Sequence, residues 1–93
     1  GVNTQEELAK ATRIVFLRKA KKLMEEGVLM INPKQTYIEE SVQVGAGTVI
    51  YPNVFLRGST QVGSFSVLES QVFVSDSRIG NSVQVKAGSY IEN

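Results

Sequence analysis

The sequence predicts a mainly β fold with one long N-terminal helix, in which a solenoid of short stacked strands follows the helix. Three observations predict this fold class. From Ile38 onward an aliphatic residue returns at every sixth position, a small or β-branched residue follows four positions after most of them, and a 23-residue segment of helical periodicity precedes the repeat. Short repeats of fixed period are typical of solenoids, whose units bury their apolar faces against one another.

We expect residues 4–26 to form one helix. At 100° per residue its apolar residues fall on one broad arc, which Lys19 and Glu26 interrupt. The arc consists of Leu8, Ala9, Thr12, Val15, Phe16, Ala20, Leu23 and Met24. Gly27 is a suitable stop, because glycine adopts the left-handed conformation that ends helices. A helix with one apolar side needs a surface to lie against, since propensity alone seldom stabilises it.

The repeat of six predicts a triangular coil of three six-residue sides. Its aliphatic positions are Ile38, Val44, Ile50, Leu56, Val62, Leu68 and Val74 and, after one dropped residue, Ile79, Val85 and Ile91. We expect Ile50 to stack on Leu68, with the segment around Asn32 on its other side, in about three coils. A β-sandwich would instead show period-two alternation with turns every 8 to 12 residues.

Composition excludes several kinds of chemistry from this chain. It has 93 residues, a formal net charge of +1, no cysteine and no histidine. It therefore lacks disulfides, thiolate metal ligands and the commonest general base near neutral pH. The small net charge argues against nucleic acid as a partner, and no apolar run is long enough to span a bilayer. No signal peptide is visible and the chain does not open with methionine, so we expect a piece of a longer, cytoplasmic protein.

Four segments in a fixed order carry a resemblance to a known family. They are GVNTQEEL, a long helix, EEGVLMINPKQTYIE, and hexapeptides that include VSDSRIGNSVQV. This order resembles the middle of the bacterial bifunctional N-acetylglucosamine-1-phosphate uridyltransferase/glucosamine-1-phosphate N-acetyltransferase family. Asn32 stands where that family usually has aspartate. The resemblance implies a left-handed parallel β-helix. Residues 1–27 would be the linker helix after a nucleotidyltransferase domain that this sequence lacks, and residues 28–93 a truncated β-helix.

The resemblance also implies a function for the parent protein. The family acetylates glucosamine 1-phosphate from acetyl-CoA and couples the product to UTP, which gives UDP-N-acetylglucosamine, a precursor of cell-wall peptidoglycan. It assembles as homotrimers and uses Mg²⁺. Asn3 matches a magnesium ligand of the family, which acts together with an aspartate from the missing domain. The family's histidine base belongs to later coils, so we expect no catalytic or cofactor-binding residue here and no activity from this chain alone.

Two other functions remain open. The chain could be a complete, non-catalytic β-helix module that forms trimers, or part of another hexapeptide-repeat acyltransferase. The GVN start and the helix favour the bifunctional family over the latter. The length of the gene would separate a fragment from a complete product.

Several other motifs have a structural interpretation that we favour. The basic stretch at residues 18–22 is typical of a solvated helix face, and residues 45–47 (Gly-Ala-Gly) of a solenoid corner rather than a nucleotide loop. The acidic residues Glu39, Glu40, Glu69 and Asp76 are expected at the surface. The remaining motif is aromatic: Phe55, Phe65 and Phe73 fall between the aliphatic positions. We expect them to point outward, as a trimer contact or as a seat for the helix.

Overall fold

The computed structural model describes residues 4–92, which form one α-helix, one 3₁₀ helix and eleven strands. The helix α1 spans Thr4–Glu25, close to the expected 4–26, and the 3₁₀ helix η1 spans Pro33–Gln35. The strands are β1 (Leu29–Met30), β2 (Thr36–Ile38), β3 (Gln43–Val44), β4 (Val49–Ile50), β5 (Val54–Arg57), β6 (Gln61–Val62), β7 (Val67–Leu68), β8 (Phe73–Ser75), β9 (Arg78–Ile79), β10 (Gln84–Val85) and β11 (Tyr90–Glu92).

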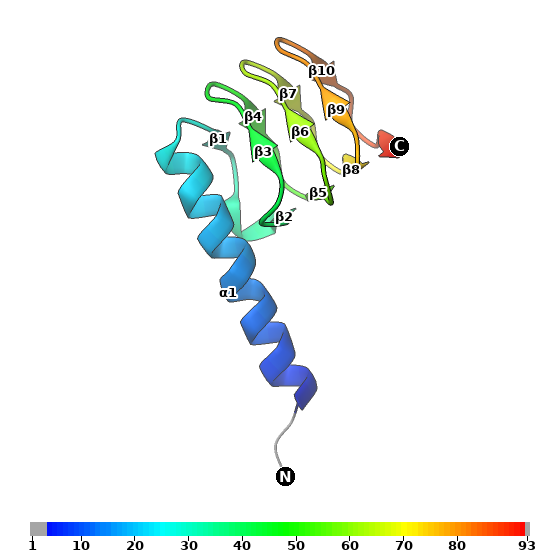
Figure 1. Cartoon of the computed structure of the whole chain (residues 1–93). Helices are drawn as coiled ribbons and strands as arrows, with labels where there is room; N and C mark the ends of the chain where they lie inside the picture. The colour runs from blue at the N-terminus through cyan, green and yellow to red at the C-terminus, as the bar shows by residue number, and fades with distance from the viewer. Residues whose placement is uncertain (1–3, 93) are drawn as a thin grey trace.

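Successive strands belong to three different parallel sheets, so the chain winds around a common core (Figure 1). The sheet orders are β1-β4-β7-β10, β2-β5-β8-β11 and β3-β6-β9. Each coil therefore has three sides. The described residues make three complete coils and two sides of a fourth, beginning at β1, one side earlier than Ile38, where the repeat first shows in the sequence. This arrangement confirms the predicted solenoid and is consistent with a left-handed parallel β-helix.

The predicted aliphatic ladder forms the core. Nine of its ten members are buried and Ile91 is partly buried. The second inward position is also buried on the sides from Thr36 to Val72, as at Val54. At Thr48 a hydroxyl occupies this position and bonds between coils: Thr48 Oγ1 donates to the Gly63 carbonyl at 2.7 Å and accepts the Ser66 N–H at 3.1 Å. The interior thus satisfies its polar groups along the stack.

The first coil is longer than the sequence predicts. Ile50 lies between Leu68, as expected, and Met30, which is twenty residues away, rather than the segment around Asn32. Helix η1 accounts for the two extra residues. The Asn32 side chain accepts the Lys34 N–H at 3.2 Å and Pro33 occupies the first turn, so a short helical bend replaces the ordinary corner.

The junction between α1 and the solenoid is a fixed turn. Gly27, at φ +95°, donates to the Met24 carbonyl at 3.1 Å, and Val28 donates to the Leu23 carbonyl at 3.0 Å. This pair of bonds is the Schellman arrangement, which needs a left-handed residue at the Gly27 position. Leu23 and Val28 are both buried in the core cluster. The helix therefore enters the first coil through a turn that the core itself holds.

Candidate functional site

The helix α1 covers the first coil with its C-terminal half only. Ala20 and Leu23 are each 1% exposed, and α1 contacts β1, η1 and β2. Leu8, toward the other end, is 67% exposed. Figure 1 shows α1 crossing the end of the solenoid and continuing past it toward the N-terminus. The expected apolar arc is thus divided: one half shields open strand edges, which otherwise attract other chains, and the other half projects away.

Lys19 corrects the expectation that residues 18–22 form a solvated face. Arg18, Lys21 and Lys22 are exposed, but Lys19 is only 4% exposed. Its ammonium donates to the Glu40 carbonyl at 2.9 Å, in the bend between β2 and β3. The Lys22 ammonium lies 3.9 Å from the Glu40 carboxylate. A buried ammonium is costly without an acceptor, so Lys19 ties α1 to coil 1 at a defined point.

A row of aromatic rings runs up the outer face of the sheet β2-β5-β8-β11. Phe16 of α1 meets Tyr37 edge-on at 5.8 Å between ring centroids, and Tyr37 stacks on Phe55 at 4.4 Å. Phe55 and Phe73 lie 6.3 Å apart, and Phe73 stacks on Tyr90 at 4.7 Å. Such pairs across neighbouring strands add to sheet stability. We call these five residues the aromatic row.

The aromatic row confirms the outward position of Phe55 and Phe73. Its helix member, Phe16, meets Tyr37, so the two phenylalanines are linked to α1 through Tyr37 rather than by the direct packing that we expected. The row also contains two residues that the sequence interpretation missed, Tyr37 and Tyr90. The spacing of the aromatic residues in the sequence indicates both positions. Tyr37, Phe55 and Phe73 are spaced by one coil of 18 residues, and Tyr90 follows after 17. Phe65 does not belong to the row. It is 71% exposed at a corner, at φ +58°.

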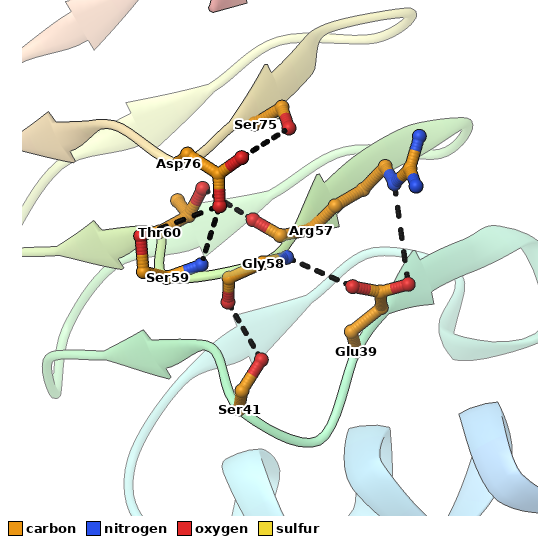
Figure 2. Close-up of polar contacts among 8 residues, drawn as sticks. All are labelled: Glu39, Ser41, Arg57, Gly58, Ser59, Thr60, Ser75 and Asp76. Atoms are coloured by element: carbon orange, nitrogen blue, oxygen red, sulfur yellow. Dashed lines mark hydrogen bonds and ion pairs between the residues drawn. The ribbon is translucent and has the colours of Figure 1, made fainter. Parts of the chain in front are cut away.

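Two of the acidic residues expected at the surface, Glu39 and Asp76, cap solenoid corners (Figure 2). Glu39 Oε1 accepts the Gly58 N–H at 2.8 Å, and its other oxygen lies 3.9 Å from Arg57 Nε. Asp76 Oδ1 accepts the Ser59 N–H at 2.9 Å from the opposite side. Acidic residues of coils 1 and 3 thereby satisfy the exposed amides of coil 2. The surface position expected for these carboxylates agrees with this capping role.

Hydrogen bonds at the corners lower the pKa of two carboxylates, Asp76 and Glu69. The Ser59 backbone N–H lowers the pKa of Asp76, aided by the hydroxyls of Ser59 and Ser75. The Ala87 backbone N–H lowers the pKa of Glu69, aided by the Gln84 amide. Hydrogen bonds to the charged form favour ionisation, so each carboxylate is held as an anion that ties one coil to the next.

Residues 45–47 form a corner, as predicted, between β3 and β4. Gly47 has φ +81°, and its N–H donates to the Gly27 carbonyl at 2.9 Å. A Cβ at Gly47 would lie 2.4 Å from the Phe65 ring, so this corner needs glycine both for its backbone and for space. Its amide is thus used within the fold rather than directed at a phosphate.

The predicted metal ligand, Asn3, lies outside the described residues. Within residues 4–92 no group of three or more acidic, cysteine or histidine side chains could hold a metal ion. No described helix combines the length and the apolar character that a bilayer span requires.

Comparison with known proteins decides the family. No family model matches the chain. The bifunctional protein GlmU of Bdellovibrio bacteriovorus is 64% identical over 93 residues, which are all of this chain and 20% of that protein. The GlmU proteins of Carboxydothermus hydrogenoformans and Pelobacter propionicus are 47% identical over 85 residues and 43% identical over 93, and the matches cover 19% and 20% of those proteins. The chain corresponds to a segment of GlmU.

The chain spans about a fifth of the length of the curated relatives it matches. What the described part offers is a shaped scaffold: a helix fixed on a solenoid end, an external aromatic row and corners closed by carboxylates. The burial of Lys19 was not evident from composition, because this residue lies in a basic run. The interruption of the apolar arc at Lys19 was its one sequence signal.

Proposed function

We propose that this chain is the linker and assembly scaffold of an enzyme that makes UDP-N-acetylglucosamine. In the whole protein, one part would acetylate glucosamine 1-phosphate from acetyl-CoA and another would couple the product to UTP with Mg²⁺, in the cytoplasm. Residues 1–27 would be the linker and residues 28–93 the first coils of the β-helix domain. The 64% identity to a bifunctional GlmU over the whole chain carries this proposal.

The geometry supports the scaffold role by the way in which α1 is fixed. Three separate contacts hold its C-terminal half: the glycine turn at Gly27, the Lys19–Glu40 bond and the buried Leu23. The direction of the free half is therefore set by the solenoid. A domain joined to that half would keep a defined orientation relative to the coils.

A replacement experiment tests the proposal. In the whole protein, these 93 residues would be replaced by the matching segment of the Bdellovibrio GlmU. Both transferase activities of this chimera would be measured as CoA release and pyrophosphate formation. We expect both activities to stay within about threefold of the parent. The isolated chain should show neither. Loss of both activities in a folded chimera, or turnover by the isolated chain, would reject the scaffold assignment.

The alternative of a trimerisation module has one observation in its favour. The aromatic row presents Phe55 and Tyr90, 41% and 65% exposed, along one face. Closed symmetric assemblies commonly bury such surfaces. Sedimentation of the 10.2 kDa chain at micromolar concentration should give a species of about three times that mass. A monomer would show that the trimer contacts of the whole protein lie elsewhere.

A further inference from the structure

An apolar groove lies between residues 5–17 of α1 and the first coil, and the scaffold role does not use it. Leu8, Phe16 and Leu17 form the helix wall, and Pro33 and Tyr37 form the wall on the coil. Its volume is about 600 Å³. Small-molecule sites typically occupy about 300 to 1,000 Å³ and are mostly apolar.

Two cations line this groove without a counter-charge. They are Arg13 of α1 and Lys34 of η1, and no carboxylate is among the lining residues. Within the described part of the chain neither side chain forms an ion pair, whereas Lys10 pairs with Glu6 and Lys22 with Glu40. An apolar trough with unpaired positive charge favours a ligand that combines an apolar body with an anionic group.

We propose that this groove binds a small amphipathic organic anion, with an aromatic or long aliphatic body and one carboxylate, sulfonate or phosphate group. The body lies against Phe16 and Tyr37, and the anion lies beside Arg13 and Lys34. The size of the groove favours a small molecule over a protein partner. Eleven residues line it, whereas a stable protein interface involves about 20 to 30 residues a side.

Two fluorescent probes with the same body test the role of the charge. The 8-anilinonaphthalene-1-sulfonate anion and the uncharged N-phenyl-1-naphthylamine would each be titrated into the chain. Exchanging both groove cations, R13Q with K34Q, should weaken sulfonate binding at least fivefold and leave the neutral probe within twofold. The matched control, R18Q with K21Q, removes two exposed cations of α1 outside the groove and should leave both affinities unchanged.

Competition identifies the occupant. Decanoate should displace the sulfonate probe, and amide chemical shifts of Leu8, Phe16 and Tyr37 should move during the titration. Equal weakening by the control pair, or no weakening by R13Q with K34Q, would overturn the proposal. So would displacement by an acidic leucine-rich helical peptide where decanoate fails, since the groove would then take a polypeptide. Circular dichroism of each variant confirms that the fold is retained.

Discussion

The first and the last described coils are built from the same repeat but differ in what covers them. At the first coil α1 packs on β1 and β2, and Ile38 is 1% exposed. At the last described coil Ile91 is only partly buried, and Val83 and Tyr90 are 38% and 65% exposed. Equivalent strands therefore occupy different environments. The comparison teaches that a repeat sets the register of a strand, while its neighbours set its stability.

The largest expected effect separates the middle of the stack from the last described coil. Ile50→Ala should cost about 2–5 kcal/mol, because Ile50 is fully buried between Met30 and Leu68 and a stiff coil closes a cavity poorly. Ile91→Ala removes the same atoms at a partly buried site and should cost about 1 kcal/mol or less. Chemical denaturation of both variants measures the difference.

Glu40→Ala is the control for these two variants. Its side chain is 67% exposed, so the change should stay within about 0.5 kcal/mol. Equal losses at Ile50 and Ile91 would contradict the comparison, and a large loss at Glu40 alone would contradict the register.

A second variant removes the cover from the first coil. Leu23→Ala should cost about 2–4 kcal/mol, because this side chain is 1% exposed and joins α1 to the core. Met24→Ala, next to it and 39% exposed, is the matched control and should cost far less. Thermal melting followed at 222 nm reports both. If the two variants melt alike, α1 does not stabilise this end of the solenoid.

The contact between Lys19 and Glu40 is expected to have a smaller effect. Lys19→Ala should cost about 1 kcal/mol, because the Glu40 carbonyl loses its ammonium donor at 2.9 Å. Lys21→Ala, at an exposed position of the same helix, should be neutral. Urea denaturation of the two variants would show a difference. An unchanged midpoint for Lys19→Ala would mean that Lys19 does not hold the helix.

The smallest effect concerns the corner carboxylates and depends on pH. The folded chain lowers the pKa of Asp76 below its ordinary 3.8, so its contribution is present above that value and is lost as pH falls through the folded value. The melting temperature of Asp76→Asn should therefore be lower than that of the wild type at pH 7. The difference between the two melting temperatures should become smaller below pH 3.8. Glu69→Gln should follow the same trend. A difference in melting temperature that grows as the pH falls would contradict this prediction.

The periodic part of the fold was predictable and the exceptions to it were not. The six-residue spacing placed every rung from Ile38 to Ile91, because the inward direction repeats with each coil side. The bend at η1 broke this rule, since Asn32 and Pro33 signal a turn without specifying that it takes two extra residues. The spacing shows where the repeat slips but not how the shorter corner closes.

The partners of charged side chains were also beyond the sequence. Lys19 sits in a basic run, and its burial follows from the angle at which α1 crosses coil 1. Asp76, at φ +50° in a corner of coil 3, accepts the Ser59 amide of coil 2. Such contacts depend on three-dimensional neighbours 17 or more residues away, which no local pattern encodes.

Native-state amide hydrogen exchange tests the central claim most directly. Three equivalent amides donate to the next coil over the same distance: Ile31 to Ile50, Tyr51 to Leu68 and Glu69 to Val85, each at 3.0 Å. If neighbours set stability, Ile31, in the coil that α1 contacts, and Tyr51, in the middle, should exchange slowly and at similar rates. Glu69 should exchange at least about tenfold faster, a difference of about 1.4 kcal/mol. Equal rates at Tyr51 and Glu69, or an Ile31 amide as fast as Glu69, would contradict the account.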